Sequence, residues 1–220
     1  MEYLSERLKT IYKMVPKGIV ADIGADHGKL MIALFEGGII SHGYAVENKK
    51  GPFNRLVKAL KEKKLENDII PLFSDGIRDL PEAVHTVVIA GMGGDNIIKI
   101  LKDSPRKAKQ IETLIVDAHS AIPKVRDEIT KMGFVIADEK MVREDDVFYE
   151  IIKFIRSEVA FYGDNDMEFG PILRKEKSAT FKEKYENRIH EIDNLLLNKN
   201  LPVERVKELS KERERIQRVL

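Results

Sequence analysis

The chain of 220 residues contains no cysteine and no tryptophan, and only 7% of its residues are aromatic. Without cysteine it can form neither a disulfide framework nor a thiolate metal site, which is compatible with a reducing compartment. No apolar run is long enough to span a membrane, and residues 1–8 lack the apolar segment of a signal peptide. Because the five histidines are scattered, we expect no bound metal. The absence of a membrane span and of a signal peptide leads us to expect no membrane association and a location in the cytoplasm.

The chain also has little net charge, since 38 basic residues balance 37 acidic ones and leave a formal charge of +1. This total gives no sign of a nucleic-acid partner, although local clusters of charge can still form a binding surface. Residues 174–220 hold 13 basic and 9 acidic residues, so they form the basic end of the chain. Oligomeric state has no clear signature in the sequence, and we expect a monomer.

Short apolar runs alternate with amphipathic segments through most of the chain. We expect strands at residues 19–23, 43–47, 69–73, 86–90, 113–117, 134–142 and 147–155. The helical pattern predicts helices at residues 5–15, 28–37, 52–64 and 95–102, with a short helical link at 76–83. Parallel strands need crossover connections, so this alternation predicts an α/β fold with a parallel sheet and helices on both faces.

The last two strands and the C-terminal residues differ from this pattern. Only residues 143–146 join the two strands, a link too short for a crossover, so we expect an antiparallel hairpin. Residues 173–220 carry two apolar stripes at helical spacing, separated by the break at 198–202 and interrupted by Arg213. We therefore predict two domains, 1–172 and 173–220, of which the second is a helical hairpin with coiled-coil packing.

The turn after the first expected strand is the strongest sign of a ligand site. Gly24 and Gly28 allow a tight turn and a close approach of the backbone, and Asp22 and Asp26 stand beside them. A dinucleotide fingerprint would need three glycines, and carboxylates would repel a pyrophosphate, but they can bind an ammonium group. With Glu47 placed to bind a ribose, the turn predicts a site for S-adenosylmethionine.

Ligands bind at the carboxyl ends of the strands in such sheets, so we take the residues just after each strand as candidates. The predicted cofactor-binding residues are Asp22, Gly24, Asp26, His27, Gly28, Glu47, Asn48, Asp75, Gly76, Ala90 and Gly91. Two of these have an alternative role. A lone histidine in such a turn, as His27 is, is more often a packing residue, and Asp75 is equally explained as a helix N-cap. Asp117 and His119 suggest an acid and base pair, or a cap beside a surface histidine.

Seven segments in this order resemble a known family: 4–8, 22–27, 47 with 50–52, 75–76, 89–94, 148–152 and 169–173. Together they are similar to the bacterial tRNA adenine-22 N1-methyltransferases, over nearly the whole chain. The resemblance implies a Rossmann-like sheet in which the last strand inserts beside the fifth, followed by a helical tail. Two segments depart from the family pattern. Residues 117–120 replace a usual Gln-Pro pair, and residues 29–31 lack a Pro after the Leu.

The resemblance also implies S-adenosylmethionine as methyl donor and tRNA as substrate, with methylation at N1 of adenine 22. Adenine N1 has a free lone pair, so the protein mainly has to position the two reactants and offset the charge on the methylated base. The predicted catalytic residues are Asp26, Gly91, Met92, Gly93, Gly94 and Asp117, with Asp95 as a further charge partner. The predicted RNA-binding residues are Arg7, Lys175, Lys177, Lys182, Lys184 and Arg188.

Two other functions fit the same sequence. One is a non-catalytic nucleoside-binding protein whose helical hairpin docks a partner, which the unusual segment 117–120 favours. The other is methyl transfer to a small molecule. The charged tail has an alternative of its own, because a solvated coiled coil explains its charges as well as an RNA-binding surface does.

Overall fold

The computed structural model describes residues 4–157 and 160–220. The contacts among its residues divide the chain into two compact units, Met1–Phe161 and Tyr162–Leu220. The first unit holds the sheet, and the second is helical. The sequence places the domain boundary at residues 172 and 173, and that position remains a prediction.

The first unit is built on one seven-stranded sheet with the strand order β3-β2-β1-β4-β5-β7-β6. Its strands are β1 (Val20–Ile23), β2 (Gly43–Glu47), β3 (Ile69–Phe73), β4 (Thr86–Met92), β5 (Thr113–Ala118), β6 (Phe134–Glu144) and β7 (Val147–Arg156). Strands β1 to β5 pair in parallel, whereas β7 is antiparallel to both β5 and β6. The predicted fold, including the last strand beside the fifth, is confirmed.

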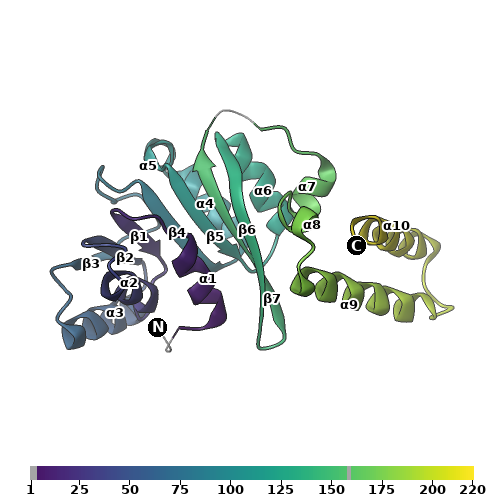
Figure 1. The fold of residues 1–220 in the computed structure, drawn as a ribbon, viewed down its shortest axis with the longest axis horizontal. Coiled ribbons are helices and arrows are strands. Elements are labelled where there is room, and N and C mark those ends of the chain that lie inside the picture. The colour runs from purple at the N-terminus through teal and green to yellow at the C-terminus, as the bar shows by residue number, and fades with distance from the viewer. Residues whose placement is uncertain (1–3, 158–159) are drawn as a thin grey trace. The chain divides into compact units, whose positions relative to one another are not determined.

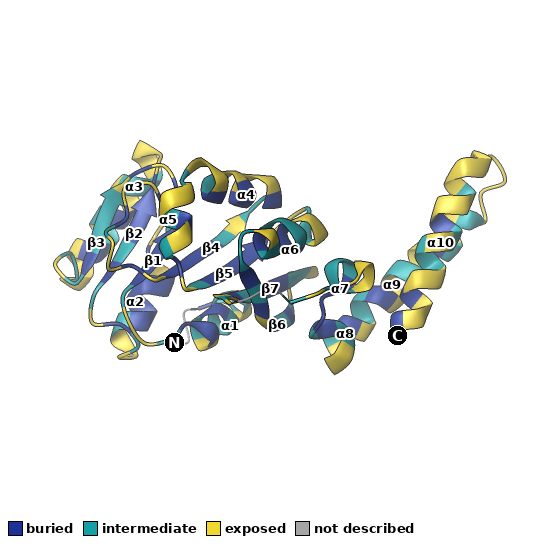
Figure 2. Cartoon of the chain, turned by 90° about the horizontal axis from the view of Figure 1, so that it is seen from above, coloured by how far each residue is buried: buried dark blue, intermediate teal, exposed yellow. Residues whose placement is uncertain are grey.

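Helices cover both faces of this sheet (Figure 1). One buried core joins side chains of α1 (Glu6–Met14), α2 (Lys29–Glu36) and α3 (Lys50–Lys63) to inward-facing residues of six strands. The other face carries α4 (Gly94–Asp103), α5 (Pro105–Gln110) and α6 (Ile122–Lys131). In Figure 2 the central strands β1, β4 and β5 are mostly buried, as expected for parallel strands covered on both faces.

Three elements differ from the prediction. The link at residues 76–83 forms turns instead of a helix, and α5 and α6 have no counterpart in the expected pattern. The α6 stripe is hidden in the sequence because Arg126 lies on its buried face, between Val125 and Ile129. A charged residue at a core position breaks the apolar periodicity by which helices are recognised.

Arg126 is fully buried and bridges α6 to the β6-β7 hairpin. Its Nε donates to Glu139 Oε1 at 2.8 Å, and its Nη2 donates to Glu150 Oε2 at 2.5 Å. All three side chains are at most 3% exposed. The arginine therefore neutralises charge on two buried carboxylates.

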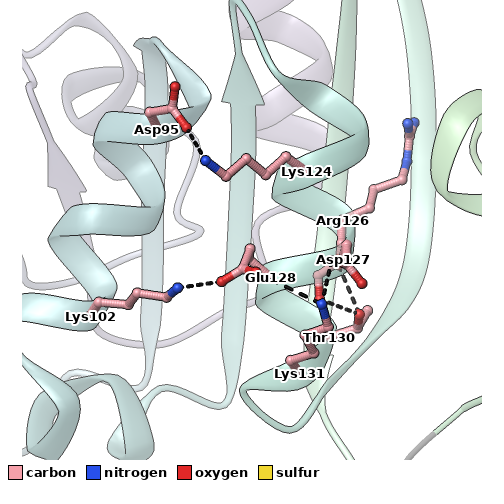
Figure 3. Close-up of polar contacts among 8 residues, drawn as sticks. All are labelled: Asp95, Lys102, Lys124, Arg126, Asp127, Glu128, Thr130 and Lys131. Atoms are coloured by element: carbon pink, nitrogen blue, oxygen red, sulfur yellow. Dashed lines mark hydrogen bonds and ion pairs between the residues drawn. The ribbon is translucent and has the colours of Figure 1, made fainter.

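Ion pairs cover the solvent side of α4 and α6, both between the two helices and along α6 (Figure 3). Lys124 pairs with Asp95, and Lys102 pairs with Glu128, so both pairs join the two helices. Lys131 pairs with Asp127 along α6. Most of the positive charge on this face is thus matched by a nearby carboxylate.

The second unit contains α7 (Asp164–Phe169), α8 (Leu173–Glu176), α9 (Ala179–Leu196) and α10 (Val203–Val219). The helices α9 and α10 contact each other through the predicted apolar stripes. Arg213, which interrupts one stripe, donates to Asp193 on the opposite helix at 2.6 Å. This confirms the predicted helical hairpin, while its coiled-coil packing remains a prediction. Over the residues that the model describes, no helix is both long and apolar enough to cross a membrane.

We expect Arg126→Ala to lower the free energy of unfolding by about 3 to 5 kcal/mol, because it leaves Glu139 and Glu150 buried without their counterion. Urea unfolding followed by circular dichroism measures this loss. Lys131→Ala is the matched control, because it removes a cation from the exposed face of the same helix and should cost less than about 1 kcal/mol. Equal midpoints for wild type and Arg126→Ala would contradict the assigned role.

Candidate active site

The carboxyl ends of β1, β2 and β3 and the end of β4 surround a cavity of about 450 Å³. The parallel register places the residues after each of these strands at one edge of the sheet. The cavity is lined by Ile23, Gly24, Val46, Glu47, Asn48, Lys49, Pro52, Ser74, Asp75, Gly76, Met92, Asn96 and Ile100. Five of the eleven predicted cofactor-binding residues are in this lining.

Gly24 is the point at which a side chain would obstruct the site. Its φ is +79°, a conformation that residues with a Cβ rarely adopt, and a Cβ there would lie 2.5 Å from the Met92 Cε. Its N–H donates to the Val46 carbonyl at 2.9 Å, which ties the turn to β2. The sequence therefore needs glycine here for both the turn and the space beside Met92.

Glu47 connects the end of β2 to the turn after β1. Its side chain is only 8% exposed, and its Oε1 accepts from the Asp26 backbone N–H at 2.6 Å. The Asp26 carboxylate in turn accepts from Arg55 of α3 at 2.8 Å. Glu47 and Asp26 thus hold the turn in place from two neighbouring elements, and Glu47 also faces the larger cavity.

Polar side chains close the far side of the same cavity. Asn48 donates to Asp75 Oδ1 at 2.9 Å, which joins the ends of β2 and β3. Both residues are exposed. The alternative role of Asp75 as a helix N-cap is wrong, because turns follow it.

A second cavity of about 190 Å³ lies on the other side of Gly24. It is lined by Arg7, Leu8, Asp22, Gly24, Ala25, Asp26, His27, Lys29, Leu30 and Ala90. Asp22 is 6% exposed. Burial raises the pKa of Asp22 to about 7, and the nearby Glu47 carboxylate adds to this effect while Arg7 opposes it. A cation placed in this cavity would favour the charged form of Asp22.

Arg7 reaches from α1 to the end of β5. Its Nη1 donates to Asp117 Oδ2 at 2.5 Å, and its guanidinium lies 5.2 Å from the centre of the Tyr149 ring. Asp117 is fully buried, and its Oδ1 has no hydrogen-bond partner among the described residues. The carboxylate therefore fixes Arg7 at the rim of the smaller cavity while keeping one oxygen uncommitted.

The glycine-rich end of β4 lines the cavities only in part, with Ala90 at the smaller cavity and Met92 at the larger one. Strand β4 continues to Met92 with a bulge at Gly91, where φ is +76°. Gly94 is buried at the start of α4, and a Cβ there would lie 2.4 Å from the Ser120 carbonyl. Of the predicted catalytic segment, only Met92 lines a cavity, so its role towards substrate remains a prediction.

Other predicted residues also lie outside both linings. Gly28 forms the N-cap of α2 against Leu56. His119 contacts the Tyr149 ring, with centroids 5.6 Å apart. In the second unit, Arg188 is held by Glu212 at 2.7 Å. The remaining predicted RNA contacts of the tail also lie in that unit, and the structure leaves their role as a prediction.

Sequence reasoning missed several residues of the two linings. They are Ile23, Val46, Lys49, Pro52, Ser74, Asn96 and Ile100 in the larger cavity, and Leu8, Ala25, Lys29 and Leu30 in the smaller one. Most of them are neighbours of predicted residues. Asn96 follows Met92 by four residues, in the first turn of α4, and its side-chain amide donates to the Met92 sulfur at 3.3 Å.

Comparison with known proteins now identifies the family. Residues 4–152 match a family model described as a methyltransferase domain. The tRNA (adenine(22)-N(1))-methyltransferase of Bacillus subtilis is 30% identical over 195 residues, which cover 83% of this chain and 79% of that protein. The chain belongs to the tRNA (adenine(22)-N(1))-methyltransferase family. The predicted resemblance is confirmed.

Solved structures of this family agree with the fold. A putative tRNA (m1A22) methyltransferase of Streptococcus pneumoniae superposes with a TM-score of 0.92 at 30% identity, with 99% of both chains covered. The same Streptococcus protein in complex with S-adenosyl-L-methionine gives a TM-score of 0.89 at 29% identity, again over 99% of both chains. The family likeness therefore extends over both units of the chain.

We expect the pH dependence of stability to report the buried Asp22. Between about pH 4 and pH 7 the folded protein keeps a proton that the unfolded chain releases, so the free energy of unfolding falls as pH rises through this window. A pKa raised from 3.8 to about 7 corresponds to a loss of about 4 kcal/mol by pH 7.5. Asp22→Asn should remove this component.

Urea unfolding of wild type and Asp22→Asn between pH 4 and pH 8 measures this difference. Asp103→Asn is the control, because Asp103 is exposed on α4 and paired with Lys99. If Asp22→Asn and wild type lose stability in parallel across the window, Asp22 does not hold the proton.

Proposed function

We propose that this protein transfers the methyl group of S-adenosylmethionine to N1 of adenine 22 in tRNA. The main support is the match to the Bacillus subtilis enzyme of that name over 83% of this chain. The chain places a glycine turn, a buried strand-end acid and a second buried carboxyl around two adjoining cavities at one edge of the sheet. A binding protein without turnover and a small-molecule methyltransferase are the alternatives that the experiment below excludes or supports.

The cavity residues fit S-adenosylmethionine. Glu47 would accept from the ribose hydroxyls, and Asp75 would accept from the adenine amino group. Asp22 would face the ammonium group, because a buried carboxyl whose pKa is raised to about 7 gains most from a nearby cation. When bound, the cofactor supplies an electrophilic methyl group on sulfur.

The residues on the acceptor side have to hold the base and offset its new charge. Adenine N1 attacks with its own lone pair, so no residue has to remove a proton first. Positive charge then develops on the base. Asp26 lines the smaller cavity and Asp117 is bound to Arg7 of the same lining, so these two carboxylates would offset that charge while Asp22 faces the ammonium group. Arg7, held by Asp117, would orient the base after it leaves its stack.

A direct assay of the product tests this function. Purified protein, S-adenosylmethionine and unmodified tRNA are incubated, and the modified nucleoside is identified and mapped by mass spectrometry. We expect 1-methyladenosine at position 22 and no product with a tRNA that carries guanosine there. Binding of the cofactor without any methylated nucleoside would support the non-catalytic alternative, and methylation of metabolites alone would support the small-molecule one.

We expect Glu47→Gln to weaken S-adenosylmethionine binding about 10- to 100-fold, because a hydrogen bond to a charged group contributes about 1.5 to 3 kcal/mol. Calorimetric titration measures this change. Glu62→Gln is the matched control, since it makes the same substitution on the exposed side of α3 and should bind as the wild type does. Similar dissociation constants for all three proteins would remove Glu47 from the cofactor site.

We also propose that the protein acts as a monomer in the cytoplasm and needs no metal ion. The attack of adenine N1 on a sulfonium methyl group requires no Lewis acid, and the substrate proposed here is a cytoplasmic RNA.

A further inference from the structure

The residues just after β2 form the most basic segment of the first unit. Residues 49–64 contain seven basic residues and one acidic residue, although the chain as a whole is almost neutral. Helix α3 spans most of this segment and buries Leu56 and Leu60 against the core. Its lysines therefore point away from the core and concentrate positive charge on one surface of the unit.

Two lysines line the cavities, and a third follows one of them in the sequence. Lys49 lines the larger cavity, Lys29 lines the smaller one, and Lys50 begins α3. All three are exposed. We call Lys29, Lys49 and Lys50 the rim lysines.

The rim lysines form no ion pair with a carboxylate within the described part of the chain, and Lys29 and Lys49 also line the cavities themselves. On the opposite face of the sheet, Lys102 and Lys124 are each paired with an acid. Arg55 of α3 is itself bound to Asp26. Three uncompensated charges at one rim make a surface that attracts an anion.

We propose that the rim lysines bind the tRNA phosphates on either side of the target adenosine. This rests on the proposed function, because a base that enters the smaller cavity brings its flanking phosphates to the rim. Lysine suits this contact, since its flexible ammonium group neutralises phosphate without reading sequence. S-adenosylmethionine carries a single carboxylate and two positive groups, so it does not account for three lysines.

The two arginines predicted from the sequence to bind RNA are less suited to this role. Arg7 is held by the buried Asp117, and Arg188 is held by Glu212. Each would have to give up an ion pair before it could bind a phosphate. The rim lysines can bind a phosphate without losing an ion pair. We therefore place the first RNA contacts on the catalytic unit.

The test compares two triple variants of the full-length chain. One variant is Lys29→Ala/Lys49→Ala/Lys50→Ala. The control is Lys13→Ala/Lys17→Ala/Lys109→Ala, which removes three exposed lysines that precede β1 or β5 and so lie at the opposite edge of the sheet. Both variants lose the same charge, so a general loss of electrostatic attraction affects them equally.

Binding of unmodified tRNA is measured by fluorescence anisotropy between 50 and 200 mM salt. We expect the rim variant to bind at least about tenfold more weakly at low salt. Each phosphate contact contributes about 0.7 to 0.9 to the slope of log K against log salt, so its slope should fall by about 2 to 3. The control should stay within about twofold of wild type, with a slope change below about 1.

Two results would overturn the proposal. One is a rim variant that binds tRNA as tightly as wild type, or no more weakly than the control. The other is a rim variant that has lost S-adenosylmethionine binding in calorimetry, because the lysines would then serve the cofactor. Failure of the proposed function is seen separately, as wild-type protein that binds tRNA through the rim lysines but forms no 1-methyladenosine.

Discussion

The hydrogen bond from the Asp26 N–H to the buried Glu47 carboxylate joins the ends of two neighbouring parallel strands. It fixes the turn after β1, because the same turn is held on its other side by the Gly24 contact with the Val46 carbonyl. The two cavities meet at Gly24, so the shape of both depends on this turn. A parallel sheet supplies such an arrangement at low cost, since its strand ends already lie side by side.

This edge of the sheet collects more buried negative charge than it neutralises. Asp22, Glu47 and Asp117 are all at most 8% exposed, and Arg7 is the cation that reaches Asp117. Burial is the main cause of the raised pKa of Asp22, and the neighbouring Glu47 carboxylate adds to it. A site of this kind is stabilised by a ligand that brings positive charge, as a sulfonium nucleoside with an ammonium group does, and a methylated adenine carries positive charge as well. The same electrostatics therefore suit both substrate and product.

Much of this arrangement could be predicted from the sequence, because the information is local. Strand β1 and its turn combine an apolar run with glycines and acids, and Glu47 ends the next strand, so position alone assigns them to one site. Long-range pairs could not be found in this way. The contact of Arg7 with Asp117 spans 110 positions. Helix α6 was missed for a related reason, since its buried Arg126 finds its partners only in the folded hairpin.

Ion pairs within the fold use part of the positive charge of this chain. Arg126, Lys102 and Lys124 have carboxylate partners, and their charge is used within the fold. The three rim lysines have no such partners, so their charges repel one another and do not stabilise the fold. Lysines without a carboxylate partner also stand away from the cavities, as Lys13 and Lys109 do, so it is the position of Lys29 and Lys49 at the cavities, where an anionic substrate has to pass, that favours binding. Composition cannot reveal this, because paired and unpaired lysines contribute equally to a net charge of +1.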